Sequence, residues 1–343
     1  MSSPSPENPS EFVRSLPKAE LHLHLEGSIN PATLLELQQR RGIEGATIGK
    51  AQEFYRYEDF AGFLLSFKAV TELLQTPEDY ELITYRLLEQ LKSQNVLHAE
   101  VYVSVGVCLW RKQDFDAVFE GLERGRERGE RDFGVSLLWI FDAVRHFGAD
   151  AAQKVAELAV RCKDQNVAGF GIGGDERRAA PELFRDVYAY CAERGLHLTA
   201  HAGETTGPES IWGALNLRAE RIGHGLSASQ DRELMEELSQ RQVPIEVCIT
   251  SNLRTDCCQS ISDHPVRSYF DQGLMITLNT DDPAMFSTTL NNEYQLAQDH
   301  FGFTDEHLRE LAQNSFEASF LPAEKKVSLI RRLSPPMVPS QRG

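Results

Sequence analysis

Short apolar runs alternate with longer amphipathic patterns along most of this chain. Each run is brief, rich in aliphatic and aromatic residues, and followed by polar residues or glycine, which is typical of strands in a parallel sheet. Between the runs, apolar positions recur at the spacing of a helix. The pattern predicts eight strands, at residues 19–25, 98–105, 135–144, 167–174, 197–203, 220–225, 244–250 and 274–282.

Strands that alternate with helices in this way form repeated βα units, and eight such units close into a barrel. We therefore predict an α/β protein with a single (β/α)8 TIM barrel. One helical pattern, at residues 181–195, ends in a glycine, as helices often do. Its apolar face is expected to contain Leu183, Phe184, Val187, Tyr188 and Cys191.

The segment between the first two strands covers about seventy residues, which is long for a connection between a strand and the next element. It contains an apolar repeat with helical spacing. We expect extra helices here that pack on the barrel and cover its C-terminal mouth, the face where barrel enzymes place their active sites. The positions of the repeat are Phe60, Phe63, Leu64, Phe67, Val70, Thr71 and Leu74.

No internal repeat, low-complexity tract or change of composition divides the chain. We therefore expect one domain at residues 13–333. The two ends, at residues 1–12 and 334–343, are rich in Ser and Pro and are expected to be flexible tails.

Charge and cysteine content narrow the range of partners. The net charge is −16, so the surface repels nucleic acid and anionic membranes. The chain shows neither an N-terminal leader pattern nor an apolar run long enough to span a bilayer, and no pair of cysteines has C-x-x-C spacing. We therefore expect a cytoplasmic protein with reduced thiols. The six cysteines are Cys108, Cys162, Cys191, Cys248, Cys257 and Cys258.

Two histidines lie in the first predicted strand, within the stretch LPKAELHLHLEGS. Side chains alternate between the faces of a strand, so His22 and His24 point to the same side, about 7 Å apart along the chain. One metal ion can bridge that distance. An H-x-H pair alone is weak evidence, because an interior pair of histidines without a metal is common.

Other titratable residues follow later strands of the predicted barrel. His201 and Glu204 end the fifth strand, His224 ends the sixth, and Asp281 and Asp282 end the eighth. Each alone has a simpler explanation, as a turn or loop residue. A barrel brings them all to one mouth, however, and these residue types bind zinc or transfer protons. The sequence therefore predicts one site that combines them.

These motifs resemble the adenosine deaminase family of the amidohydrolase superfamily. That family shows H-x-H, H-A-G-E, R-x-G-H-G, S-N and T-D-D-P in this order, and the chain reads LHLHLEGS, HAGE, ERIGHG, TSN and LNTDDP. The similarity extends from residue 16 to about residue 320. It implies a hydrolytic deaminase that replaces the amino group of a 6-aminopurine by oxygen.

The resemblance also assigns the metal site. It implies one Zn²⁺ per chain, with a water in an open coordination position. Nitrogen and carboxylate ligands suit zinc on general grounds. The related enzymes with two metals commonly carry a modified lysine at the end of strand four, and GFGIGGDE has no lysine. The implied ligands are His22, His24, His201 and Asp281.

Further roles follow from the same resemblance. Glu204 is expected to donate a proton to N1 of the purine, and His224 to stabilise the attacking oxygen, with Asp281 facing the same water. The backbone N–H of Gly174 is expected to reach N3, and Asp282 to reach N7. We also expect contacts with the small-molecule substrate from His24 and Glu26.

The substrate is less well determined, because one motif departs from the family pattern. Adenosine deaminases usually read H-L-D-G where this chain has HLEG, and that aspartate contacts the 5′-hydroxyl of the sugar. The extra methylene of Glu26 alters this contact. The remaining motifs favour adenosine and 2′-deoxyadenosine as substrates. The alternative is 6-amino-6-deoxyfutalosine, from the futalosine route to menaquinone.

Two other possibilities rank lower. Adenine-specific relatives tend to read R-I-D-H-G where this chain has RIGHG, which disfavours free adenine, and AMP deaminases are longer. A barrel that only binds a ligand, without catalysis, should have lost at least one metal or acid-base residue. Every such position is filled here.

Overall fold

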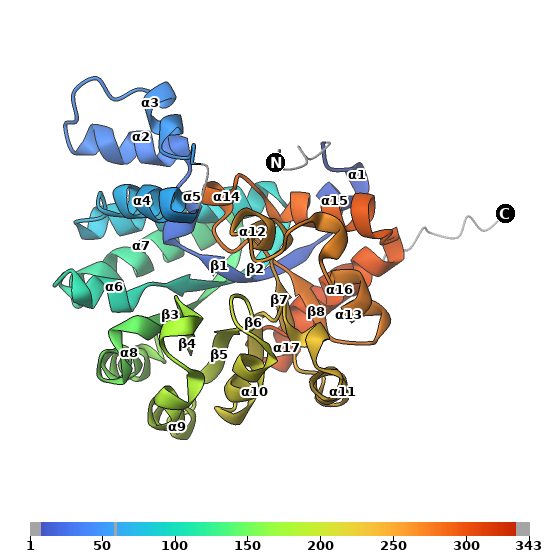
Figure 1. The fold of residues 1–343 in the computed structure, drawn as a ribbon. Helices are drawn as coiled ribbons and strands as arrows, with labels where there is room; N and C mark the ends of the chain where they lie inside the picture. The colour runs from blue at the N-terminus through green and yellow to red at the C-terminus, as the bar shows by residue number, and fades with distance from the viewer. Residues whose placement is uncertain (1–7, 58–59, 334–343) are drawn as a thin grey trace.

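The computed structural model describes residues 8–57 and 60–333, and the side chains of residues 60 and 61 are not described. Eight parallel strands follow one another around a sheet in chain order, from β1 to β8. Backbone hydrogen bonds join the ends of the sheet, from Asp281 N to His22 O (3.0 Å) and from His24 N to Asp281 O (2.8 Å). The predicted (β/α)8 barrel is therefore confirmed (Figure 1).

Each predicted strand is present, with ends that differ by a few residues. The strands are β1 (Lys18–His24), β2 (Val96–Val103), β3 (Ser136–Val144), β4 (Val167–Gly173), β5 (His197–Ala202), β6 (Arg221–His224), β7 (Ile245–Val247) and β8 (Ile276–Leu278).

Helices surround the barrel, and several begin at a capping side chain. Asn30 accepts a hydrogen bond from Thr33 N at the start of α2, and Asp114 caps α7 in the same way. The α-helices are α1 (Glu11–Ser15), α2 (Pro31–Arg40), α3 (Ile48–Glu53), α4 (Phe60–Thr71), α5 (Pro77–Ser93), α6 (Val105–Trp110), α7 (Phe115–Phe133), α8 (Ala149–Cys162), α9 (Arg185–Glu193), α10 (Pro208–Asn216), α11 (Arg232–Arg241), α12 (Ile249–Arg254), α13 (Val266–Asp271), α14 (Pro283–Phe286), α15 (Leu290–Phe301), α16 (Asp305–Glu317) and α17 (Ala323–Ile330).

Single turns of 3-10 helix complete the connections. They are η1 (Glu26–Ser28), η2 (Arg145–Phe147), η3 (Glu176–Arg178), η4 (Pro181–Phe184), η5 (Ala228–Gln230), η6 (Ile261–Asp263) and η7 (Arg331–Leu333).

Two predicted apolar positions are exposed rather than buried. Leu183 is 62% exposed because it belongs to η4, whose tighter winding puts it out of phase with α9. Leu64 on α4 is 50% exposed, whereas Phe63 and Val70 on the same helix are buried. The predicted helical period is correct in both segments, but the apolar face is narrower than the sequence suggests.

The extra helices between β1 and β2 reach over the mouth of the barrel. The Tyr55 hydroxyl donates to the backbone of Ile29, just after β1, and the Tyr57 hydroxyl donates to the carbonyl of Met285, just after β8. The rings of Phe63 and Phe286 stack with centroids 5.2 Å apart. This segment therefore joins the rims of two adjacent strands and covers part of the site between them.

The first strand is locally irregular where it carries the histidines. Its pairing with β2 shifts between Glu20 and Leu23, and the Asn279 side chain accepts hydrogen bonds from both Leu21 N and His22 N (2.9 and 3.1 Å). A register shift of this kind re-aims the side chains that follow it. The leucines of β1 are fully buried in the hydrophobic core, and the histidines face the barrel interior beside the ring of Tyr102.

The ends of the domain differ slightly from the prediction. Helix α1 begins at Glu11, inside the segment predicted as a tail, and Ser10 N donates to the Gln295 side chain (2.8 Å). Residues 1–7 and 334–343 lie outside the described residues. None of the described helices is both long and apolar enough to cross a membrane. All six cysteines are free thiols, as predicted.

Candidate active site

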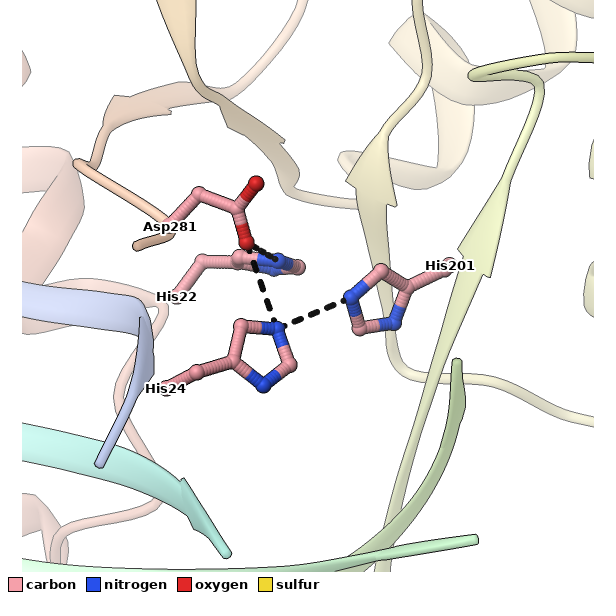
Figure 2. A group of neighbouring side chains, drawn as sticks. All are labelled: His22, His24, His201 and Asp281. Carbon is pink, nitrogen blue, oxygen red and sulfur yellow. Dashed lines mark hydrogen bonds and ion pairs between the residues drawn. The ribbon is translucent and has the colours of Figure 1, made fainter. Parts of the chain in front are cut away.

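Four of the predicted residues converge at the C-terminal mouth of the barrel (Figure 2). The Nε2 atoms of His22 and His24 lie 3.5 and 3.2 Å from one carboxylate oxygen of Asp281. His201 Nε2 lies 3.2 Å from His24 Nε2. The four donor atoms all lie within 4.8 Å of one another. The predicted metal-ligand set is therefore assembled in the fold.

Hydrogen bonds behind this cluster orient its donor atoms. His22 Nδ1 donates to Glu246 (2.7 Å), and His201 Nδ1 donates to the carbonyl of Ile172 (3.0 Å). When the two rings are neutral, these bonds leave Nε2 as the nitrogen that can bind a metal ion. The second oxygen of Asp281 accepts from the Ser251 hydroxyl (2.7 Å). Metal-binding histidines and carboxylates are typically held in this way.

The same cluster fits a cation on physical grounds. His22 Nε2 is buried and has no hydrogen-bond partner among the described residues. Burial disfavours a charge on His22 and His24, yet attraction by the nearby carboxylates, Asp281 above all, outweighs it, so the pKa of His22 rises to about 9 and that of His24 to about 10. The carboxylates thus favour positive charge here, which a metal ion supplies.

Two of the predicted site residues adopt an unusual backbone conformation. His224 and Asp281 have φ angles of 63° and 65°, in the left-handed region that non-glycine residues rarely occupy. Such conformations persist where the surrounding structure holds them, and they are common at active sites. Asp281 is held by its two backbone hydrogen bonds to β1.

Glu204 lies beside the metal-ligand cluster and faces His224. Its Oε2 is 3.7 Å from His224 Nε2. Burial raises the pKa of Glu204 to about 8, and the charges of Asp281 and Glu176 act in the same direction. The carboxyl group is therefore largely protonated at neutral pH, as a proton donor requires.

A chain of hydrogen bonds fixes the tautomer of His224. Val266 N donates to His264 Nδ1, His264 Nε2 donates to the Asn252 side-chain oxygen, and Asn252 Nδ2 donates to His224 Nδ1 (3.3, 3.2 and 3.2 Å). Burial lowers the pKa of His224 to about 4, so the ring is neutral. Its single proton is then on Nε2, the nitrogen that faces the site.

Asp282 and the neighbouring glycines shape the remaining space. A Cβ atom at Gly27 would lie 1.8 Å from an oxygen of Asp282, so only glycine leaves room for this carboxyl group. That oxygen is buried without a hydrogen-bond partner among the described residues, and burial and Asp281 raise the pKa of Asp282. Gly174 follows β4 with a φ of 87°, which favours glycine at this turn.

Glu26 is buried next to this space, in η1. Its Oε1 accepts a hydrogen bond from Ser104 N (3.1 Å), whereas its Oε2 is buried and has no partner among the described residues. Burial raises the pKa of Glu26. Glu26, which the sequence predicts to contact the substrate, is thus a buried acidic group of the mouth with one oxygen that has no partner among the described residues.

The sequence does not predict the role of Glu176. Its carboxylate accepts hydrogen bonds from the loop after β5, and these bonds lower its pKa although burial opposes them. The Asp-Glu dipeptide after Gly174 is the only signal in the sequence. The five donors are Gly203 N (2.9 Å), Glu204 N (2.8 Å), Thr205 N (3.0 Å), the Thr206 hydroxyl (2.9 Å) and the Ser210 hydroxyl (2.5 Å).

We expect Glu176→Gln to lower kcat by about 10- to 100-fold, because an amide cannot accept all five bonds and Glu204 loses its position. Removing this charge also lowers the pKa of Glu204, so activity is lost at a lower pH than in the wild type. A pH–rate profile measures both effects. Glu182→Gln, at an exposed residue of η4, is the control. An unshifted profile with normal kcat would contradict the role of Glu176.

Comparison with known proteins identifies the family. The family model described as adenosine deaminase matches residues 17–335. The chain belongs to the adenosine deaminase family. It is 38% identical to the aminodeoxyfutalosine deaminase of Streptomyces coelicolor over 329 residues, covering 94% of this chain and 85% of that protein.

Solved structures agree with this membership of the adenosine deaminase family. An adenine deaminase from Arthrobacter aurescens superposes with a TM-score of 0.87 at 32% identity, covering 93% of this chain and 98% of that one. An amidohydrolase from Burkholderia ambifaria with bound Zn has a TM-score of 0.86 at 28% identity, covering 97% and 94%. The protein is thus a hydrolytic deaminase that acts on carbon–nitrogen bonds of cyclic amidines, as predicted, and its family is metal-dependent.

Proposed function

We propose that this protein deaminates 6-amino-6-deoxyfutalosine, releasing ammonia and leaving an oxo group at C6 of the purine. The sequence motifs alone favour adenosine and give this substrate as the alternative. The observation that carries the change is the 38% identity to a relative named aminodeoxyfutalosine deaminase, over nearly the whole chain. A second Streptomyces protein with that name is equally similar.

The sugar end of the site supports a substrate other than adenosine. Glu26 stands where adenosine deaminases usually have the aspartate that contacts the 5′-hydroxyl. One oxygen of Glu26 is already bonded to Ser104 N, so its longer side chain presents a different acceptor to the sugar. Aminodeoxyfutalosine carries a substituted carbon chain in place of that hydroxyl group, so it does not need the aspartate.

Gly223 argues against free adenine as the preferred substrate. A Cβ atom at this position would lie 2.7 Å from His22 Cε1 and 3.3 Å from the His201 backbone. The aspartate that adenine-specific relatives tend to have there does not fit beside His22 in its present orientation. The metal ligands of this chain are thus packed against a glycine.

Zinc is the metal that we propose for the cluster of His22, His24, His201 and Asp281. Three imidazole nitrogens and one carboxylate oxygen are ligands that suit zinc. When bound, the metal would polarise a water molecule for attack on C6 of the purine.

The remaining groups of the site bind the purine and transfer protons to it. We assign to Glu204 the donation of its proton to N1, which makes C6 more electrophilic and lets the amino group leave as ammonia. The Nε2–H of His224 stabilises the oxygen that adds to C6, and Asp281 faces the same oxygen. Gly174 N–H binds N3, and protonated Asp282 donates to N7. We expect His24 and Glu26 to contact the sugar side.

The proposal is tested by kcat/KM on one zinc-loaded preparation. We expect aminodeoxyfutalosine to exceed adenosine, 2′-deoxyadenosine and adenine by about 100-fold or more, since binding energy from the distal group contributes to the transition state. An equal or higher kcat/KM for adenosine would favour adenosine as the substrate, as the sequence motifs alone do. A higher kcat/KM for adenine would contradict both adenosine and aminodeoxyfutalosine as the preferred substrate.

A further inference from the structure

Arg254 is a cation at the mouth of the barrel with no acidic partner among the described residues. It ends α12, and Ser251, one helical turn earlier, bonds to Asp281. Residues three apart lie on the same side of a helix, so Arg254 lies above the metal-ligand cluster. Its Nε is buried and has no hydrogen-bond partner among the described residues. The half-buried guanidinium therefore has donors to spare.

An aromatic surface lies beside this cation. The guanidinium carbon of Arg254 is 5.3 Å from the centroid of the Tyr57 ring. The ring centroid of Tyr57 lies 5.7 Å from that of Phe63, and the Phe63 ring stacks on Phe286. Helix α12 packs against α14, the helix that follows Asp282 directly (Figure 1). The aromatic rings and the guanidinium thus line the rim of the barrel next to the proposed purine site.

Tyr57 contacts both Arg254 and the segment after Asp282. Its ring centroid lies 5.3 Å from the guanidinium carbon of Arg254, and its hydroxyl donates to the carbonyl of Met285, three residues after Asp282. Burial raises the pKa of Tyr57, Arg254 lowers it by interaction with the hydroxyl, and the charge of Asp282 raises it. All three groups are therefore electrostatic neighbours. The Tyr57 ring and the guanidinium of Arg254 are therefore neighbours at the rim that follows Asp282.

Two other arginines near the mouth are already engaged. Arg111 donates two hydrogen bonds to Thr71 (2.8 and 2.9 Å). Arg145 is completely buried and donates to the carbonyls of Ala179 and His201. Arg254, by contrast, has an unbonded buried Nε and lies beside an aromatic face.

We propose that Arg254 and Tyr57 bind an aromatic carboxylate at the end of the substrate remote from the purine. Aminodeoxyfutalosine has such a group, so this inference rests on the proposed function and extends it. A guanidinium binds a carboxylate through two parallel hydrogen bonds, and Tyr57 offers its face to the ring that bears it. A phosphate would use the same cation without the aromatic contact.

The test compares Arg254→Gln with Arg56→Gln, which removes the same charge at an exposed residue next to Tyr57. We expect Arg254→Gln to raise KM for aminodeoxyfutalosine by about 10- to 100-fold, the loss expected for a charge-assisted contact, with kcat within about threefold. The methyl ester of the same substrate, and adenosine, should change by less than about threefold. Arg254→Lys should recover part of the loss, and Arg56→Gln should match the wild type.

Product inhibition separates this inference from the proposed function. Futalosine and its methyl ester are used as competitive inhibitors, with whichever purine the wild type turns over as the substrate. A Ki that Arg254→Gln raises for futalosine and not for the ester supports the inference, even if adenosine proves to be the better substrate. Equal losses for acid and ester, or a loss confined to AMP as an added phosphate probe, would overturn it.

Discussion

Glu204→Gln is expected to lower kcat by about 10³-fold or more while the protein keeps its fold and its bound metal. The amide has nearly the shape of the carboxyl group, so it fills the same space next to His224. It has no acidic proton to give to N1 of the purine. Steady-state kinetics and elemental analysis on the same preparation measure the two quantities.

The dependence of activity on pH tests the role of Glu204 independently. Because the pKa of Glu204 is raised to about 8, the wild type holds the proton below that pH and loses activity as the pH rises through it. The residual activity of Glu204→Gln should not show this fall as the pH rises. Glu209→Gln, at an exposed residue of α10, is the matched control. Near-normal turnover of Glu204→Gln would refute the assignment.

His201→Ala is expected to reduce bound metal well below one equivalent per chain. The change removes one of four donors and leaves a gap beside His24 Nε2. The loss of a ligand usually weakens binding by several orders of magnitude, and activity should fall with it. Elemental analysis after dialysis against a weak chelator measures the effect directly.

The control for this variant comes from the same strand. His197→Ala changes a histidine at the opposite end of β5, where the ring is about half exposed and stacks on Phe320, far from the mouth. It should retain one equivalent of metal. Added zinc should raise the melting temperature of the wild type and of His197→Ala, but not of His201→Ala. A full equivalent of metal in His201→Ala would contradict its role as a ligand.

The strands and the ligand set were predictable because they depend on local patterns. Alternation along β1 puts His22 and His24 on one side, and the barrel brings the ends of β5, β6 and β8 together regardless of loop details. Which side chains of a short helical turn are buried depends less on the local pattern of residues. Leu183 is exposed because it lies in the 3-10 turn η4, which winds more tightly than the α-helix α9 that follows. The spacing of the apolar residues does not distinguish a 3-10 turn from an α-helix.

The supporting residues were not predictable in the same way. Glu246 holds His22 across 224 positions of sequence, and Glu176 reaches the loop around Glu204 from η3, the turn after β4. Their partners are mostly backbone amides, hydroxyls and ring nitrogens, which have no sequence signature. The left-handed backbone of His224 and Asp281 is likewise set by the closure of the barrel.

One reaction tests the central claim most directly. The zinc-loaded protein is given aminodeoxyfutalosine, adenosine and adenine at equal, limiting concentrations in water labelled with heavy oxygen, and the products are followed by mass spectrometry. We predict that aminodeoxyfutalosine is consumed first, with one labelled oxygen gained and one ammonia released per molecule. Consumption of another purine first, or a product without the label, would contradict the claim.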